Sequence, residues 1–332
     1  MADMMRAAVL EAHGRPFRLT TLPRPVPAPG QVLVRIAASG TNPLDTKIHA
    51  GTAAHARHPL PAILGLDLAG TVEALGPGET RFAPGDEVFG MAGGVGGHQG
   101  SLAEYAAVDA DLLAHKPGNL DMREASGLPL VFITAWEGLV DKMAVRAGQT
   151  VLVHGGAGGV GRMVVQLARA YGAEVFATGS AASRTTIELM SARFIERSEP
   201  VDAYVARLTQ GRGFDLVYDT AGGASLDASF AAVRRSGHVV SALGWGTHDL
   251  APLSLRAATY SGIFTLLPLL TGRGRVHHGE ILAHAKRLAE SGQLVPLLDP
   301  HVFTLETVMG AYRLLDDGSA RGKLVVDIEE QR

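Results

Sequence analysis

The chain has 332 residues, 46% of them hydrophobic and 19% charged, which is ordinary for a soluble globular protein of about two domains. A formal net charge of −3 gives no electrostatic signature of a nucleic-acid partner or of an anionic membrane surface. No apolar run approaches the ~20 residues needed to span a bilayer, and the first residues lack the pattern of a signal peptide, so we expect a cytoplasmic protein without a membrane partner.

The absence of cysteine is the most restrictive feature of the composition. It removes disulfides, thiol nucleophiles, iron–sulfur clusters and cysteine-ligated zinc together. The closest approaches to a histidine cluster are His55 with His58 and the adjacent pair His277 and His278. We interpret both pairs as solvated surface histidines, and we therefore expect no metal site.

The first ~120 residues predict short strands separated by turns, as in a compact barrel. Residues 5–10 and 18–22 resemble a hairpin, and alternating prolines then form a stiff connector. Further strands are expected at 31–38, 68–75, 87–91 and 101–108.

The pattern changes near Asp121, where an acidic residue followed by Glu124 predicts the start of a helix. From Thr150 onward, apolar strand-like segments alternate with helix-like ones, which is typical of a doubly wound parallel sheet. The expected strands are 150–154, 174–178, 193–196, 214–218, 238–243 and 259–267; the expected helices between them are 163–170, 183–191, 201–209 and 225–233. The tail predicts helices at 279–288 and 305–315, an extended segment at 294–303 and a closing strand at 323–328.

The stretch from Thr150 to Gly172 carries the strongest motif, a G-x-G-x-x-G between a strand and a helix. We expect Gly156 to permit the tight turn, Gly158 to let the backbone approach a pyrophosphate, and Gly161 to let helix and strand pack closely. The backbone expected to hold a dinucleotide is Gly156, Gly158, Gly159, Val160 and Gly161. A glycine turn without a ligand is the alternative.

Several strings, taken in order, resemble one superfamily. They are Asn42–Asp45, Leu64–Gly70, Arg81–Val88, Leu128–Leu130, Thr134–Trp136, the glycine loop and Gly322–Val326. The chain is similar to the medium-chain dehydrogenase/reductases, in the zinc-independent, quinone-oxidoreductase-like (zeta-crystallin-like) branch. The resemblance implies an α/β fold with a GroES-like β-barrel catalytic domain, residues 1–122 plus 268–332, and an inserted Rossmann cofactor domain, residues 123–267.

The resemblance also locates the positions that bind catalytic zinc in the zinc-dependent relatives. Asn42 and Leu130 stand where those enzymes have cysteines, and Leu66 stands where they have a histidine. An amide and two leucines cannot serve as zinc ligands, since zinc binds thiolate, imidazole or carboxylate. Without a Lewis acid to activate an alcohol, we expect hydride transfer to an acceptor that is already electron-poor, a quinone or an α,β-unsaturated carbonyl. An enoyl-thioester reductase and a non-catalytic NADPH-binding protein are the alternatives.

The end of the strand after the glycine loop favours NADPH. NAD-binding sites carry an acid there to hold the ribose 2′-hydroxyl, whereas this strand ends in Ala177–Ser180. Ser180 and Arg184 are candidates for binding a 2′-phosphate. An ordinary surface arginine is the alternative for Arg184.

The candidate catalytic residues are Asn42, Asp45 and Thr134, of which Asn42 and Thr134 match family positions near the nicotinamide. Asn42 could also be a turn residue before Pro43, Asp45 could be a helix N-cap, and Thr134 could bond back to a helix carbonyl. The loop 49–56 lacks the tyrosines that quinone-reducing members often have, which favours a different or smaller acceptor.

Two further segments resemble family features. Leu243 and Gly244 resemble the backbone beside the nicotinamide, or form only a strand-terminating turn. Residues 259–267 resemble the strand that pairs across a dimer, so we expect a homodimer.

Overall fold

The computed structural model describes residues 3–329, and the chain divides into two compact units. One unit comprises Met1–Leu130 with Leu266–Arg332, and the other comprises Val131–Thr265. Residues 1–2 and 330–332, which the predicted catalytic domain includes, lie outside the described range. The predicted domain boundaries, after residues 122 and 267, remain a proposal.

The second unit is built on a parallel sheet with the strand order β11–β10–β9–β12–β13–β14. Its strands are β9 (Thr150–His154), β10 (Glu174–Gly179), β11 (Arg193–Glu196), β12 (Phe214–Asp219), β13 (Val233–Ser241) and β14 (Thr259–Gly262). The order confirms the predicted doubly wound sheet. The chain's path through the sheet reverses at β9, and the carboxyl end of such a strand is where these sheets bind ligands.

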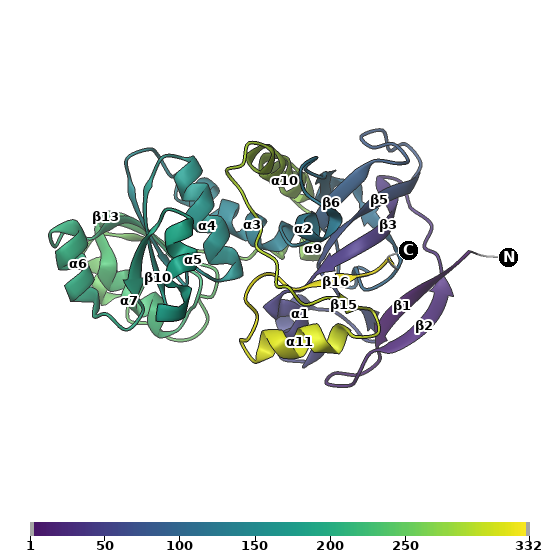
Figure 1. Cartoon of the computed structure of the whole chain (residues 1–332), viewed down its shortest axis with the longest axis horizontal. Coiled ribbons are helices and arrows are strands. Elements are labelled where there is room, and N and C mark those ends of the chain that lie inside the picture. Colours follow the sequence, from purple (N-terminus) through teal and green to yellow (C-terminus); the bar gives the residue numbers. More distant parts are fainter. Residues whose placement is uncertain (1–2, 330–332) are drawn as a thin grey trace. The chain divides into compact units, whose positions relative to one another are not determined.

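Helices cover this sheet, as Figure 1 shows for the teal and green part of the chain. They are α3 (Pro129–Trp136), a π-helical turn η3 (Glu137–Lys142), α4 (Gly159–Ala170), the short η4 (Ala181–Ser183), α5 (Arg184–Leu189), α6 (Val201–Thr209), α7 (Ala224–Ala232) and α8 (Ala251–Ser254). Leu152, Phe176, Phe214, Val217 and Phe230 are buried together in one core cluster. The central strands β9 and β12 are mainly apolar and buried, because both faces of the sheet are covered there.

The first unit contains a larger, mainly antiparallel sheet of order β15–β16–β3–β5–β6–β8, with β7 pairing to β3, and a small sheet of order β2–β1–β4. Its strands are β1 (Met4–Leu10), β2 (Arg18–Pro23), β3 (Gln31–Gly40), β4 (Ala62–Ile63), β5 (Asp67–Leu75), β6 (Glu87–Met91), β7 (Tyr105–Asp109), β8 (Leu113–His115), β15 (Phe303–Thr304) and β16 (Val325–Asp327). The register between β3 and β5 shifts twice, and such irregularities bend a sheet as a barrel requires.

The C-terminal segment returns to this first unit. β16 pairs with β3, and α11 lies beside α1, as Figure 1 shows in yellow and purple. The helices of the unit are α1 (Pro43–His49), η1 (Ala54–Ala56), η2 (Ala110–Leu112), α2 (Met122–Ser126), α9 (Leu267–Thr271), α10 (Arg275–Glu290) and α11 (Val308–Asp316). The pairing confirms the prediction that the second unit is an insertion in the first.

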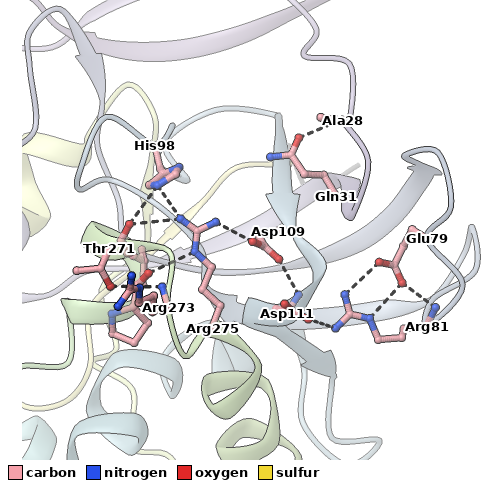
Figure 2. A network of polar contacts seen from close by, with 12 residues as sticks. Ala28, Gln31, Glu79, Arg81, His98, Asp109, Asp111, Thr271, Arg273 and Arg275 are labelled. Atoms are coloured by element: carbon pink, nitrogen blue, oxygen red, sulfur yellow. Dashed lines mark hydrogen bonds and ion pairs between the residues drawn. The ribbon is translucent and has the colours of Figure 1, made fainter.

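A polar network fixes the start of α10 to the barrel (Figure 2). The guanidinium of Arg275 donates to Asp109 Oδ2 at 2.7 Å and lies 3.0 Å from His98 Nε2. The network continues through Asp111, whose backbone N–H donates to Asp109 and whose carboxylate pairs with Arg81. The returning segment is therefore held by charge-assisted hydrogen bonds as well as by strand pairing.

Some sequence predictions were wrong in detail. The predicted strand 259–267 ends at Gly262, because its partner β13 ends at Ser241, which pairs with Gly262. The short strands β4 and β8 were not predicted. His278 is 1% exposed on the inner face of α10, and His58 is partly buried, so neither is a solvated surface histidine.

Within residues 3–329, we find no helix with the length and apolar character that crossing a bilayer requires.

Candidate functional site

The glycine loop follows β9 at the reversal point of the sheet. Gly155 has a φ of +75°, a conformation that L side chains rarely adopt, so the tight turn depends on this residue. The prediction that Gly156 permits this turn was wrong, because Gly156 does not have a positive φ. A Cβ at Gly156 would instead lie 2.5 Å from the Cβ of Ala177, so packing against β10 demands glycine there.

The remaining glycines form the start of α4. A Cβ at Gly161 would lie 2.2 Å from the carbonyl oxygen of Gly155, so the helix packs directly on the loop. Gly158 is the exposed N-cap, and its nearest neighbour would be 3.3 Å from an added Cβ. The N–H groups of Gly159, Val160 and Gly161 lie in the first turn, where no helix carbonyl can accept from them, and the helix dipole there favours an anion. This cradle fits the pyrophosphate of a dinucleotide.

The carboxyl ends of β10 and β11 lie next to each other. Ser180 follows β10 and is partly exposed, and the backbone N–H of Arg197 donates to the carbonyl of Gly179 at 2.9 Å. Arg184 pairs with Glu188 at 3.3 Å, so its charge is already partly compensated. Arg197 was not predicted as a site residue. It directly follows the predicted strand 193–196, and the carboxyl end of that strand lies at the same edge of the sheet as the carboxyl end of β10.

The ends of β12 and β13 are joined by a buried carboxylate. Asp219 accepts hydrogen bonds from Ser241 Oγ at 2.7 Å and from the backbone N–H of Gly222 at 3.0 Å. Ser241 Oγ in turn accepts from the N–H of Leu243 at 3.0 Å, and Gly244 is exposed beyond it. Asp219 therefore fixes the path of the segment that contains Leu243 and Gly244.

Thr134 lies on α3 and is nearly buried. Its Oγ1 is 3.1 Å from Thr265 Oγ1, and Thr265 donates to Glu137 Oε2 at 2.8 Å. Because Thr265 has a single hydroxyl proton, Thr134 is the donor of the first bond. Tyr218 Oη also donates to the carbonyl of Thr134 at 2.6 Å, so this helical turn is held on β12.

In the first unit, Asn42 is fully buried at the N-cap of α1. Its Nδ2 donates to Asp67 Oδ2 at 2.9 Å, and its Oδ1 accepts from the ammonium of Lys323. Asp45 is the third helical residue and not the N-cap, and its Oδ2 accepts from the backbone N–H of Asn42 at 2.8 Å. Both ends of the Asn42 amide are therefore engaged within the unit.

Asp67 and Lys323 complete this cluster, and sequence reasoning gave neither a role. Asp67 accepts from Asn42 Nδ2, from the backbone N–H of Leu130 at 2.9 Å and from Lys323 Nζ at 3.4 Å. Burial raises the pKa of Asp67 and lowers the pKa of Lys323, while each favours the charged form of the other. With three donors around its carboxylate, Asp67 is the acid best able to stay ionised.

Asp45 is in the opposite situation. Burial and the nearby Asp67 charge raise the pKa of Asp45 to about 7, against the hydrogen bond from Asn42, which lowers it. Within residues 3–329 its Oδ1 has no hydrogen-bond partner. Two carboxyls and one ammonium are electrically balanced when one carboxyl holds a proton, and the raised pKa makes Asp45 the carboxyl that binds a proton more readily.

This cluster does not fit catalytic zinc. Leu66 is fully buried and has no donor atom, Asn42 has both amide ends engaged, and the ammonium of Lys323 lies against them. A dication beside a buried ammonium is repelled. In the described part of the chain, no three His, Asp or Glu side chains form a group that could hold a metal ion.

The predicted site residues thus fall into two sets. Asn42 and Asp45 meet in the first unit, together with Asp67 and Lys323. The glycine loop, Ser180, Arg184, Leu243, Gly244 and Thr134 belong to the second unit.

Comparison with known proteins identifies the superfamily. Residues 28–118 match the family described as the alcohol dehydrogenase GroES-like domain, and residues 192–326 match the family described as zinc-binding dehydrogenase. A crystal structure of an alcohol dehydrogenase superfamily protein from Novosphingobium aromaticivorans is 57% identical, with a TM-score of 0.96 over 98% of this chain and 100% of that one. The predicted GroES-like barrel is thereby confirmed.

Two curated relatives carry names that state an activity. The Arabidopsis thaliana protein named NADPH-dependent alkenal/one oxidoreductase, chloroplastic, is 34% identical over 303 residues, which are 89% of this chain and 72% of that protein. The Homo sapiens quinone oxidoreductase is 29% identical over 335 residues, 97% of this chain and 98% of that protein. The chain also matches three polyketide synthase proteins at 33 to 35% identity, of whose length it spans only 13 to 18%.

Proposed function

Since this chain belongs to the medium-chain dehydrogenase/reductases, in their zinc-independent, quinone-oxidoreductase-like branch, we propose that it reduces quinones or α,β-unsaturated carbonyls with NADPH. The observation that carries the proposal is the cluster of Asn42, Asp67 and Lys323, which offers a buried ammonium where the metal-dependent relatives need metal ligands.

The proposed chemistry suits such a site. NADPH, when bound, supplies a hydride, and an electron-poor acceptor needs only positioning and a partner for its developing negative charge. We propose that Asn42 and Thr134 lie near the nicotinamide, as their family positions imply. Asn42 then acts as a positioning residue, because its amide holds Asp67 and Lys323. Asp45 is the proposed reservoir of a proton, since it is the buried carboxyl that keeps one near neutral pH.

A nicotinamide cofactor follows from the family, and NADPH is our proposal within it. Its support is the end of β10, which has Ser180 and no acid, beside the cations Arg184 and Arg197. The proposed partners of the pyrophosphate and nicotinamide halves are the backbone of Gly156–Gly161 and of Leu243 and Gly244.

Cofactor choice is tested by fluorescence titration of NADPH and NADH. A charge-assisted hydrogen bond contributes about 1.5–3 kcal/mol, so losing the 2′-phosphate partner should weaken NADPH binding about 10- to 100-fold and leave NADH binding unchanged. We expect this from Arg197→Ala, and a smaller effect from Arg184→Ala because Glu188 competes for its charge. Arg146→Ala is the matched control, since Arg146 precedes β9 at the opposite, amino edge of the sheet. Tighter binding of NADH by the unaltered protein contradicts the assignment.

The acceptor class is tested by turnover with 1,2-naphthoquinone, an alkenal and a crotonyl thioester. Reduction of the first or second supports the proposal. Reduction of the thioester alone supports the enoyl-thioester alternative, which the polyketide synthase relatives favour. Tight NADPH binding without turnover of any of the three supports the non-catalytic alternative.

A homodimer and a cytoplasmic location are the remaining parts of the proposal. β14 is an edge strand of the parallel sheet, and Tyr260 on it and Phe264 beyond it are both exposed. Edges of this kind are normally covered. Sedimentation equilibrium should give twice the chain mass, and a monomer at micromolar concentration removes the dimer.

A further inference from the structure

A cavity of about 440 Å³ lies in the first unit, away from the buried cluster around Lys323. Its walls come from the tip of the β1–β2 hairpin, the end of α1 and the loop that follows α1. The hairpin tip is fixed there, because the N–H of Gly14 donates to the carbonyl of His49 at 2.8 Å. The volume is within the range of small-molecule sites.

Among the described residues that line this cavity, Arg57 is the only one with a permanent charge. Residues 46–66 contain no aspartate or glutamate, while they include Lys47, His55, Arg57 and His58. Arg57 lines the cavity and forms no ion pair with any residue in the range 3–329. Burial and the Lys47 charge lower the pKa of His55, and burial lowers the pKa of His58, so Arg57 is the permanent charge of the wall.

His58 adds an unmet donor on the same wall. Its Nδ1 accepts from the backbone N–H of Gly97 at 3.3 Å, so the ring proton resides on Nε2. Within the described residues, the buried Nε2 has no hydrogen-bond partner of good geometry, and the weak hydrogen bond to the Ile63 backbone only partly offsets the lowering of the pKa by burial. The exposed guanidinium of Arg57, which has no carboxylate partner among the described residues, and the weakly bonded N–H of His58 are the groups on this wall that can donate to negative oxygens.

Apart from the exposed imidazole of His13, the rest of the lining is small and apolar. Ile48, Ala53, Ala54 and Pro59 contribute it, and residues 46–66 contain no phenylalanine, tyrosine or tryptophan. A quinone is best held by aromatic stacking, for which this wall provides no surface. An aliphatic chain ending in an anion matches both parts of the lining.

We propose that this cavity binds an anionic group, a carboxylate or a phosphate, of a small aliphatic acceptor, with Arg57 as its specificity-determining residue. The proposal rests on the proposed function in one respect, that the ligand is the acceptor. The negative oxygens can come from a free unsaturated acid or from the phosphates of a coenzyme A thioester.

The experiment compares matched acceptors with and without the charge. The carboxylate pair is 4-oxopent-2-enoate and its amide, and the phosphate pair is crotonyl-coenzyme A and crotonyl-N-acetylcysteamine. We expect kcat/KM at least 10-fold higher for the anionic member of one pair, and the responding pair identifies the source.

Arg57→Asn should remove that preference and leave the neutral acceptors unchanged. Asparagine suits the position because Arg57 has φ +48° and ψ +43°, a left-handed conformation that asparagine adopts readily. Arg57→Lys, which keeps the charge, should retain most of the preference. Arg313→Asn, at an exposed arginine on α11, is the matched control.

Binding of the unreactive anions 4-oxopentanoate and coenzyme A, measured by calorimetry, separates the two proposals. Turnover without any charge preference, and anion binding that Arg57→Asn does not weaken, overturn the anion site and leave the proposed function standing. Anion binding that Arg57→Asn weakens 10-fold or more, without turnover of any acceptor, supports the anion site and overturns the proposed function.

Discussion

Asn42 links two charged side chains that are far apart in the sequence. Lys323 is 281 positions away from it, yet its ammonium is the partner of the Asn42 amide oxygen. Replacing one member of such a buried group leaves the others without compensation, which is far more destabilising than the net stabilisation from the intact group. Asn42, Asp67 and Lys323 therefore act as one cluster. The effect of replacing any one of them, even conservatively, includes the loss of compensation for the other two.

Asp45 gives this cluster a pH dependence. Its pKa in the folded protein, about 7, is above the ordinary value of 3.8, so the protonated form is favoured by folding. Protonated Asp45 therefore contributes to the free energy of unfolding. This contribution is fully present below pH ~4 and is lost as the pH rises through about 7, because the unfolded chain releases the proton more readily than the folded protein does.

Asp45→Asn should remove this loss, since an asparagine can still accept from the Asn42 N–H. Each pKa unit corresponds to 1.36 kcal/mol, so between pH 5 and pH 7 the variant should gain roughly 2–3 kcal/mol in unfolding free energy relative to the unaltered protein. Urea denaturation at the two pH values measures the difference. Parallel pH profiles for the two proteins contradict a buried proton on Asp45.

At the scale of elements, the glycine loop contains glycines with two different roles, one in packing and one at the exposed surface. Gly161 is required by packing, because an added Cβ would lie 2.2 Å from the Gly155 carbonyl oxygen, whereas Gly158 is exposed and an added Cβ would lie 3.3 Å from the same oxygen. The structure thus distinguishes a glycine that holds the helix from one that leaves room for a ligand.

Gly161→Ala should shift the backbone of loop and helix, and we expect about 1–3 kcal/mol of destabilisation together with weaker cofactor binding. Gly158→Ala should leave the melting temperature nearly unchanged but weaken NADPH binding, since its methyl group occupies the surface that faces a pyrophosphate. Calorimetry and fluorescence titration of both variants make the comparison. An unchanged melting temperature for Gly161→Ala would be inconsistent with the packing role.

The elements most accurately predicted are those whose local pattern decides their structure. Strand 193–196 and helix 201–209 have the predicted bounds, because apolar period and flanking turn residues mark both ends. The strand predicted over 259–267 was too long, since an apolar run alone cannot show where pairing with β13 stops. Asp67 and Lys323 could not be paired from the sequence, because only the return of the C-terminal segment to β3 brings them together.

At the scale of the whole molecule, one unit is inserted in the other, and each contains some of the candidate site residues. The inserted unit provides the glycine cradle at the reversal of its sheet. The other unit provides the Lys323 cluster and the cavity lined by Arg57.

The most direct test is the reduction of an enone by chelator-treated protein with NADPH that carries deuterium at the transferable position of nicotinamide C4. Mass spectrometry of the product should show one deuterium on the carbon β to the carbonyl, at a rate that neither the chelator nor added zinc changes. A product without deuterium, or turnover that appears only when zinc is added, would contradict zinc-independent hydride transfer by this protein.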